Sequence, residues 1–371
     1  MKKLFFFLNT RDLGAHHRRE EIFEYHRQAK KFDTEVKVFL QPKCVFLSRN
    51  KTQANGQDSV KAIQLWCLIP LSLAEKSPLL MWLLVNLPVY WQLRKFNVRS
   101  SVSWFYRPEQ RAYIPRKSFN VFLMYDHYVA DSELRKREKV ERELRKCFNQ
   151  SDIVLVCSKK LLNEYASDQA KFLYYPNAIS NSLIDGARRA SQLDSAGSNN
   201  KVKFQIGFVG NMDQSFDVSL VEYLVSNNVD MEFVFVGPYS KSTSVILEQY
   251  KNVRMTGRVD YSMLSRYIAS FDLCICPYKQ DEFSSYRNPL KVFEYLAHNK
   301  PVVATRCDLP ENITRKITIV ASDTSFSDCL KNTKIFRQPF SKEELERYYK
   351  SNSWQARVEL VFFELGRLDY S

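Results

Sequence analysis

The sequence lacks an uncharged stretch long enough to cross a lipid bilayer as a helix. The longest such stretch, Ser77 to Leu93, has 17 residues and is interrupted by Asn86 and Pro88, whereas a spanning helix needs roughly 20 apolar residues. The run from Leu4 to Leu8 is too short for the apolar core of a signal peptide, and charged residues follow it at once. We therefore expect a protein that is not integral to a membrane.

Cysteines at metal-ligand spacing are also missing. The eight cysteines are scattered, and Cys274 and Cys276 form a single close pair inside the apolar run DLCICPY. Because no second pair lies at ligand spacing, we expect buried strand residues in a reducing cytosol. No motif requires a metal or another cofactor, although magnesium remains compatible with the sequence.

The composition is that of a folded protein with an uneven charge. The chain has 371 residues, of which 45% are hydrophobic and 14% aromatic, enough for two domains with their own cores. Residues 1–180 hold 31 Lys and Arg against 18 Asp and Glu, whereas the remaining 191 residues hold 24 against 23. The basic first half predicts an anionic partner, which can be nucleic acid, a membrane surface or a phosphorylated ligand.

Strand-like apolar runs alternate with amphipathic stretches along the whole chain, a pattern typical of α/β layers around parallel sheets. In the first half these runs are 4–9, 36–42, 101–106, 121–126 and 152–158. In the second half they are 204–210, 231–237, 253–257, 273–278, 301–305 and 317–321. The small polar residues of 186–201 indicate an interdomain linker between the two series, and an amphipathic helix is expected after Ser353.

The ends of the predicted second-half strands share a composition that suits a ligand site. Ligands of open parallel sheets bind beyond the carboxyl ends of the strands. Glycine there allows close approach of the backbone to a ligand, although such glycines are common in ordinary turns. The residues at these ends are Gly210, Asn211, Gly237, Pro238, Gly257, Arg258, Pro277 and Tyr278.

The segment NPLKVFEYLAHNKPVVAT adds a helix at the same edge. Asn288 is the expected cap and Pro289 the expected first residue. Lys291 then lies in the first turn, where the helix dipole disfavours a cation. One interpretation is a surface ion pair with Glu294 on the same face. The other is a diphosphate site, in which Lys291, Arg287 and backbone N–H groups bind the anion and Glu294 accepts hydrogen bonds from a ribose.

This segment resembles the donor-binding segment of GT-B glycosyltransferases, which use nucleotide sugars and have two Rossmann-like domains facing across a cleft. IGFVGNM, FVFVGP, residues 252–278 and PVVAT follow the second domain of that family in order and spacing. Residues 151–179 resemble the end of its first domain. The resemblance implies an α/β GT-B chain with an acceptor-binding domain at 1–180, a linker at 181–201, a donor-binding domain at 202–350, and a final helix at 351–371 that crosses back to the first domain.

The resemblance also implies roles for individual residues. Lys291 would neutralise the donor diphosphate, Glu294 would bind the ribose, and Arg258 would lie near the base. Gly210 and Asn211 would lie near the phosphates or the sugar. The other residues of the expected donor site are Tyr278, Tyr286, Arg287 and Asn288.

Two departures from the family pattern leave the stereochemistry of transfer open. Tyr286 stands where many retaining members have a second glutamate, and GNMDQSFD lacks the Arg and Lys that many of them carry at that place. The pattern is closer to a bacterial branch that includes membrane-associated glucuronosyltransferases of exopolysaccharide assembly.

If the reaction inverts configuration, one carboxylate removes the proton of the acceptor hydroxyl. The segment MYDHYVADSE supplies two candidates, Asp126 and Asp131, each of which is explained equally well as a cap or turn residue. His16 is an alternative base. The loop after the first strand would line the acceptor side, unless it is a plain polar turn; its other candidates are Gly14, His17 and Arg18.

The first hypothesis is therefore a glycosyltransferase of bacterial surface polysaccharide synthesis, such as capsule or O-antigen. It would move a sugar from a UDP- or GDP-sugar to a glycan acceptor, either lipid-linked or free. The basic first half suits a cytoplasmic protein that is peripheral on the anionic inner leaflet. Residues 62–93, followed by Arg94 and Lys95, fit interfacial helices on that surface or, as we prefer, a buried helical hairpin of the first domain.

Two other functions remain open. A nucleotide-sugar epimerase would use the same fold, but would leave the basic first half without a role. A nucleic-acid-binding protein would explain the isoelectric point of about 9.3, but the sequence has no RNP-type aromatic pattern, zinc finger or basic recognition helix. The charged stretch 132–150 is typical of an amphipathic helix with one solvated face, so we expect no nucleic-acid partner.

Overall fold

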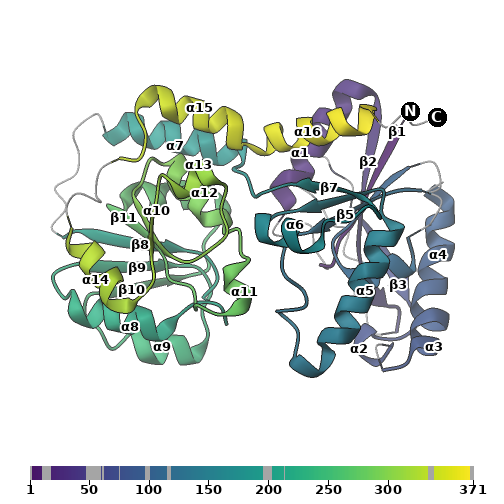
Figure 1. Ribbon diagram of the computed structural model, residues 1–371, viewed down its shortest axis with the longest axis horizontal. Helices are drawn as coiled ribbons and strands as arrows, with labels where there is room; N and C mark the ends of the chain where they lie inside the picture. Colours follow the sequence, from purple (N-terminus) through teal and green to yellow (C-terminus); the bar gives the residue numbers. More distant parts are fainter. Residues whose placement is uncertain are drawn as a thin grey trace. The chain divides into compact units, whose positions relative to one another are not determined.

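The computed structural model describes residues 2–10, 18–46, 60, 62–74, 76–96, 101–114, 118–194, 203–212, 214–332 and 338–367. The chain divides into two compact units, one of Met1–Tyr175 with Val358–Ser371 and one of Pro176–Arg357. Each unit contains a parallel sheet with helices packed on it (Figure 1). The expectation of two α/β units with Rossmann-type sheets is confirmed.

The described strands of the first unit form a parallel sheet in the order β3-β2-β1-β4-β5-β6-β7. They are β1 (Lys2–Phe7), β2 (Thr34–Cys44), β3 (Ala62–Cys67), β4 (Val102–Phe105), β5 (Phe119–Met124), β6 (Ile153–Val156) and β7 (Lys171–Tyr174). The order reverses between β1 and β4, as in doubly wound folds, where ligands bind beyond the carboxyl ends of the strands.

The run of aromatic residues in β1 forms the centre of this sheet. Phe5, Phe6 and Phe7 are all buried, because helices cover both faces of a doubly wound parallel sheet. The ring centroid of Phe7 lies 5.0 Å from that of Phe39 in β2, and the centroid of Phe6 lies 5.1 Å from that of Trp104 in β4. An uninterrupted apolar run is therefore what this central strand requires.

The helices of the first unit are mostly short between β3 and β4 and longer elsewhere. They are α1 (Arg19–Ala29), α2 (Leu71–Ala74), α3 (Pro78–Met81), the π-helix η3 (Trp82–Asn86), α4 (Leu87–Leu93), α5 (Arg137–Gln150) and α6 (Lys159–Tyr165). Short 3₁₀ turns add η1 (Lys30–Phe32), η4 (Arg94–Phe96), η6 (Pro108–Ala112) and η7 (Leu134–Lys136).

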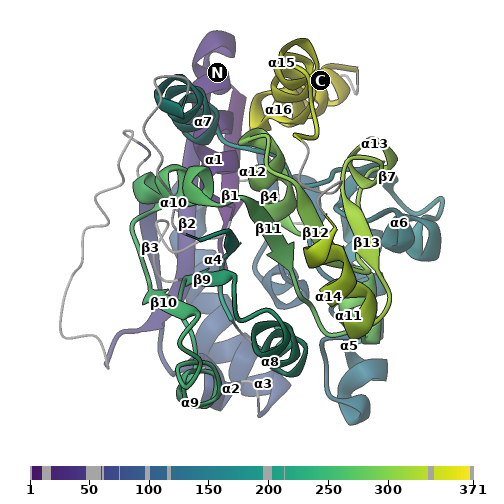
Figure 2. The same ribbon diagram turned by 90° about the vertical axis from the view of Figure 1, so that its left-hand side faces the viewer.

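The described strands of the second unit form a parallel sheet in the order β10-β9-β8-β11-β12-β13, which Figure 2 shows from β10 at one edge to β13 at the other. They are β8 (Gln205–Val209), β9 (Glu232–Val236), β10 (Val253–Gly257), β11 (Leu273–Cys276), β12 (Val302–Thr305) and β13 (Thr318–Val320). Each lies within the run predicted for it, and the order reverses between β8 and β11.

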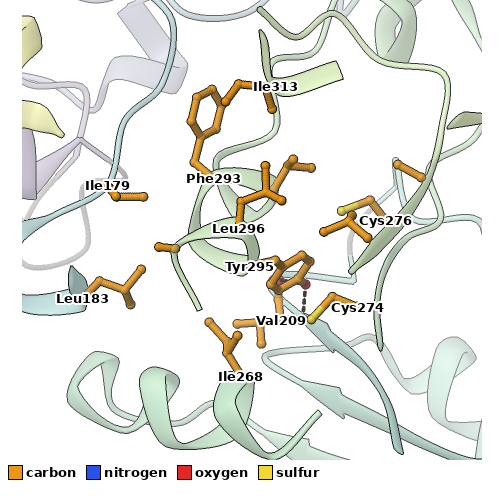
Figure 3. Close-up of a cluster of buried hydrophobic side chains, with 14 of the residues drawn as sticks. Ile179, Leu183, Val209, Ile268, Cys274, Cys276, Phe293, Tyr295, Leu296 and Ile313 are labelled. Carbon is orange, nitrogen blue, oxygen red and sulfur yellow. Dashed lines mark hydrogen bonds between the residues drawn. The ribbon is translucent and has the colours of Figure 1, made fainter. Parts of the chain in front are cut away.

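The core of the second unit has two layers, one on each face of its sheet. In β8, Phe208 packs into one layer and Val209 into the other, because side chains of a strand alternate between the faces. Figure 3 shows residues of the second layer, to which Cys274 and Cys276 contribute as the sequence predicted. The helices are α7 (Asn181–Asp194), α8 (Val218–Asn227), α9 (Lys241–Leu247), α10 (Leu264–Ser270), α11 (Glu282–Ser285), α12 (Leu290–Ala297), α13 (Glu311–Thr314), α14 (Asp323–Lys331) and α15 (Lys342–Asn352), with the 3₁₀ turn η8 (Tyr261–Met263).

The predicted linker is wrong over its first part, because residues 181–194 form helix α7. Leu183, Ile184 and Ala187 bury their side chains in the second unit. Gly186, which suggested a flexible segment, has a packing role: a Cβ there would lie 2.2 Å from the hydroxyl oxygen of Ser265 in α10. The glycine therefore allows close contact between two helices.

The final helix, α16 (Trp354–Arg367), begins with the second unit and ends with the first. Its Phe362 ring lies 5.9 Å from the ring of Tyr25 in α1, and its Glu364 carboxylate accepts a hydrogen bond from Lys171 in β7. The expected return of the last helix to the first unit is confirmed.

Candidate functional site

Three glycines follow one another across the carboxyl edge of the second sheet, at the ends of β8, β9 and β10. Gly210, Gly237 and Gly257 all have positive φ angles, of 143°, 135° and 70°, which side-chain-bearing residues rarely adopt. The Gly237 N–H donates to the Gly257 carbonyl at 2.9 Å, and a Cβ on Gly237 would lie 2.1 Å from the Gly210 carbonyl oxygen. Packing of backbone on backbone therefore requires at least one of these glycines.

Lys291 lies directly above the end of β8. It is the second residue of α12, and its Nζ atom lies 3.9 Å from the ring centroid of Phe208 and 4.9 Å from that of Tyr278. A Cβ on Gly210 would come within 2.7 Å of the same Nζ atom. The lysine thus lies where the strand order reverses between β8 and β11.

Helix α12 is fixed in this position by tyrosine hydroxyl groups. The Val209 N–H at the end of β8 donates to the Tyr295 hydroxyl at 2.7 Å, the bond drawn in Figure 3. Tyr295 follows Lys291 by one turn, so both side chains face the same strand. Tyr295 anchors the helix and Lys291 supplies the cation. From α15, Tyr348 donates to the Phe293 carbonyl at 2.9 Å and Tyr349 to the Ala297 carbonyl at 2.7 Å.

A second cation lies at the same aromatic ring. The guanidinium carbon of Arg287 is 4.7 Å from the Tyr278 ring centroid and 5.4 Å from that of Phe283, and Nη1 donates to the Ser215 hydroxyl. The Tyr278 N–H donates to the Thr305 hydroxyl at 3.0 Å, which fixes the loop after β11. Ser215 was not among the residues expected from the sequence. Only the departure of its segment, GNMDQSFD, from the family pattern could have pointed to it.

The thiol of Cys276 does not offset these cations. Burial raises its pKa to about 12, although Lys291 and Arg287 act in the opposite direction. The thiol is therefore neutral at physiological pH and adds no negative charge beside the lysine and the arginine.

Asn288 does not cap α12 as expected. Pro289 occupies the N-cap position instead, and no side-chain cap bond is formed there. The Asn288 side chain accepts from the Asn177 N–H and donates to the Asp308 carbonyl, both at 2.9 Å. Because it is buried and ties two distant loops together, its role is structural.

Glu294 is buried one turn along α12, and its backbone carbonyl accepts a hydrogen bond from His298 Nδ1 at 2.8 Å. A donating Nδ1 carries the ring proton, which leaves Nε2 unprotonated. Burial lowers the pKa of His298 to about 4, so the imidazole directly after α12 is neutral.

The remaining expected donor residues lie on loops at the same edge of the sheet. Asn211 follows β8 and Arg258 follows β10, and both are exposed, whereas Tyr286 is half-buried after α11. The loop carrying Asn211 is tied to the loop after β9, because the Met212 N–H donates to the Pro238 carbonyl at 3.0 Å.

The structure places Arg18 in the core of the first unit and not on an acceptor surface. Its side chain is 1% exposed and forms an ion pair of 3.4 Å with the fully buried Glu21. Burial raises the pKa of Glu21 even beside this guanidinium. A buried charge needs a partner of opposite sign, which explains the position of Arg18 at the start of α1. Gly14, His16 and His17 lie outside the described residues.

The two candidate carboxylates lie after β5, in different environments. Asp126 is half-buried and Asp131 is exposed. Tyr125 is half-buried, and loss of solvent raises its pKa, while Arg107 lowers it and Asp126 raises it. The guanidinium of Arg107 lies 5.1 Å from the Tyr128 ring centroid. Burial acts to lower the pKa of Arg107, but the neighbouring groups of Tyr125, Glu109, Tyr128 and Asp131 raise it overall. Arg107 was one of several cations in its segment, and the sequence did not single it out.

His127, between the two aspartates, is buried and has both ring nitrogens engaged. Nδ1 accepts from the Ala130 N–H at 3.3 Å, and Nε2 lies 3.5 Å from the Glu164 carboxylate. An Nδ1 that accepts a hydrogen bond places the proton on Nε2, so this histidine offers no lone pair to a substrate.

Metal ligands and membrane spans are both absent from the described residues. Among them, no group of three or more His, Cys, Asp or Glu side chains is placed to hold a metal ion. No described helix is both long enough and apolar enough to span a bilayer.

Comparison with known proteins bears on the unit that carries Lys291. Residues 203–332 match the family described as Glycosyl transferases group 1. This match lies within the second unit and spans about a third of the chain. The chain is also 33% identical over 103 residues to a Bacillus subtilis protein provisionally named as a teichuronic acid biosynthesis glycosyltransferase. That match covers 27% of this chain and 26% of the relative, so it spans about a quarter of the length of either protein.

Solved structures extend the likeness to the whole chain. Sucrose-phosphate synthase of Thermosynechococcus elongatus matches with a TM-score of 0.74 at 14% identity, over 99% of each chain. The protein HepE of Anabaena, solved with UDP and glucose, matches with a TM-score of 0.63 at 12% identity, over 99% of this chain and 100% of that one. These likenesses confirm the GT-B fold expected from the sequence.

Proposed function

We propose that the protein is a glycosyltransferase that moves a sugar from a nucleoside diphosphate sugar to a glycan acceptor. The match of residues 203–332 to the group 1 glycosyl transferases supports the class of reaction. The observation that carries the proposal is the position of Lys291, whose Nζ lies above Gly210 at the reversal of strand order. UDP bound to the similarly folded HepE agrees with a uridine nucleotide as one donor type.

The donor diphosphate is proposed to bind at the start of α12. Lys291 and Arg287 supply positive charge there. The first turn of α12 adds backbone N–H groups that its N-cap residue does not cap with a side chain, and the amino end of a helix favours anions. Glu294, one turn deeper, is proposed to accept hydrogen bonds from the ribose, and Arg258 to lie near the base.

Transfer then needs a base in the first unit, for which we propose Asp126 or Asp131. The acceptor hydroxyl oxygen forms a bond to the anomeric carbon, while the bond from that carbon to the diphosphate oxygen breaks. The carboxylate takes the hydroxyl proton, and the nucleoside diphosphate leaves with the bonding pair. In this scheme the charge on the departing diphosphate is stabilised by the cations at α12.

The proposed setting is bacterial surface polysaccharide synthesis at the cytoplasmic face of the membrane. The name of the Bacillus relative supports a cell-envelope polysaccharide. The excess of Lys and Arg in residues 1–180 suits an acceptor carried by a lipid diphosphate in an anionic leaflet.

Calorimetric titration of Lys291→Ala with UDP, GDP and their sugars tests the donor site. We expect donor affinity to fall about tenfold to a hundredfold, since a hydrogen bond to a charged group contributes about 1.5–3 kcal/mol. Lys241→Ala, an exposed lysine of the same unit, is the matched control and should bind like the parent. Equal affinity in Lys291→Ala and parent would refute the diphosphate assignment. Conversion of a donor to another sugar nucleotide without acceptor would show an epimerase.

The base is tested by Asp126→Asn and Asp131→Asn, assayed with saturating donor. Removal of a general base is expected to lower turnover about a hundredfold to ten-thousandfold in one of the two. Donor affinity should be unchanged, because neither residue belongs to the unit that carries the proposed donor site. Asp168→Asn, at an exposed position of the same unit, controls for surface charge. Full activity in both variants would contradict this assignment and direct the search to His16.

A further inference from the structure

Large apolar side chains are exposed along one side of the segment from α2 to α4. Leu79, Trp82 and Trp91 are 63%, 56% and 64% exposed. The other exposed members of this row are Leu73, Leu80, Leu83 and Leu87. Leu79, Leu83, Leu87 and Trp91 recur every four residues, the spacing of one helix face.

The opposite side of the same segment is packed against the first unit. Ala74, Val85, Val89 and Leu93 are buried, and β3, beside which the helices lie, is the edge strand of the sheet (Figure 1). The segment is therefore apolar on two sides, of which one packs against the first unit and the other is exposed. Neither of our expectations for residues 62–93 was complete, because the stretch begins with strand β3 and its helices are buried on one face only.

Two neighbouring loops extend the exposed row. Val45 and Phe46, after β2, are 48% and 79% exposed, and Leu68, after β3, is 40% exposed. The Val45 N–H donates to the Cys67 carbonyl at 3.0 Å and the Leu68 N–H to the Leu84 carbonyl at 2.8 Å, so these loops are joined to the helical segment. Together, Val45, Phe46, Leu68 and the exposed row from Leu73 to Trp91 form what we term the Leu/Trp face.

Cations border the Leu/Trp face. Lys76 is exposed before α3, and Arg94 and Lys95 are exposed after α4. The guanidinium of Arg94 lies 5.6 Å from the Trp91 ring centroid. From Lys76 to Arg107 the sequence contains no acidic residue.

We propose that the Leu/Trp face docks on the surface of an anionic lipid bilayer. Helices that lie in the membrane interface combine leucine and tryptophan on the buried side with basic residues beside the headgroups, and tryptophan is enriched at that depth. Residues 78–93 would extend about 24 Å in the membrane plane at 1.5 Å per residue. The described charged residues beside the face, Lys76, Arg94 and Lys95, are all cations, to which an anionic headgroup layer is complementary.

The test is co-sedimentation of the full chain with vesicles, without nucleotide or acceptor. Vesicles of phosphatidylglycerol and phosphatidylethanolamine in equal parts should bind the protein, and vesicles of phosphatidylcholine should bind it much more weakly. Because neither donor nor acceptor is present, the outcome is independent of the proposed glycosyl transfer. Absence of sedimentation with the anionic vesicles would overturn the proposal.

The matched variants are two triple substitutions at equally exposed apolar positions. Leu79→Gln/Trp82→Gln/Trp91→Gln should weaken partitioning into the anionic vesicles roughly tenfold or more, because less apolar surface would be buried in the bilayer. Val229→Gln/Val245→Gln/Phe363→Gln, at residues 69%, 67% and 61% exposed elsewhere, should partition like the parent. Because all six side chains are exposed, both variants should keep the parent's circular dichroism and melting temperature. Equal partitioning of the two folded variants would contradict the assignment to this face.

The charged border is tested by Arg94→Gln/Lys95→Gln. Each cation near an anionic surface contributes a factor of about five in binding, so the double variant should bind about 25-fold more weakly, and parent binding should fall with added salt. A competing outcome is that the parent forms a dimer in light scattering, the Leu/Trp triple variant is monomeric, and neither binds vesicles. That result would make the face a protein interface and the proposal wrong.

Discussion

Single side chains at the carboxyl edge of the second sheet place positive charge against aromatic rings. Lys291 lies against the rings of Phe208 and Tyr278, and Arg287 lies against Tyr278. An aromatic face attracts a cation and fixes its position. The rings thus hold both cations at the edge where the diphosphate is proposed to bind.

Arg18 has a different environment, because its charge is buried and paired with the carboxylate of Glu21. Arg18→Met would leave the buried carboxylate of Glu21 without its partner, which typically costs about 3–5 kcal/mol. We expect urea unfolding to show a loss of that size in the transition of the first unit.

The control for Arg18 is its neighbour Arg19, which is partly exposed and pairs with Glu20. Arg19→Met should cost less than about 1 kcal/mol. The double variant Arg18→Met/Glu21→Gln should recover part of the loss, since both charges are then removed. Equal free energies of unfolding for Arg18→Met and Arg19→Met would contradict a large contribution of the buried pair to stability.

At the scale of elements, α12 is held by tyrosine hydroxyl groups along its second half, at Phe293, Tyr295 and Ala297. Tyr295→Phe keeps the ring but removes the acceptor of the buried Val209 N–H, and an unsatisfied buried group costs about 1–3 kcal/mol. We expect a lower melting temperature and a donor affinity several times weaker, because Lys291 shares the helix. Thermal unfolding and calorimetry measure both quantities.

A suitable comparison is Tyr250→Phe, whose hydroxyl donates to Glu222 at the edge of the second unit. It should leave donor affinity unchanged. An unchanged donor affinity in Tyr295→Phe as well would mean that the anchoring of α12 has no part in placing the lysine.

The strands of the second unit could be predicted from the sequence, because short apolar runs that end in glycine or proline are typical of buried parallel strands. Helix α7 could not, since Gly186 and the small residues around it indicate a loop until their contact with α10 is known. The cap of α12 was misassigned for a similar reason. Asn288 is a good cap residue by type, but its hydrogen bonds go to Asn177 and Asp308, which are remote in sequence.

Two features of the whole molecule were ambiguous in the sequence. They are the packed side of the apolar segment from α2 to α4 and the role of the basic stretch of α5. A segment that is apolar all round gives no period that says which side is packed, so the exposed row from Leu73 to Trp91 could not be predicted. The basic stretch of α5 is explained by ion pairs on its own exposed side, such as Arg145 with Glu141 at 2.7 Å and Lys146 with Glu143 at 2.7 Å.

A crystal structure of the protein with UDP would locate the diphosphate. We expect its density within hydrogen-bonding distance of Lys291 Nζ and of the first backbone N–H groups of α12. Ordered nucleotide bound elsewhere, with no density for the diphosphate beside Lys291, would contradict this expectation.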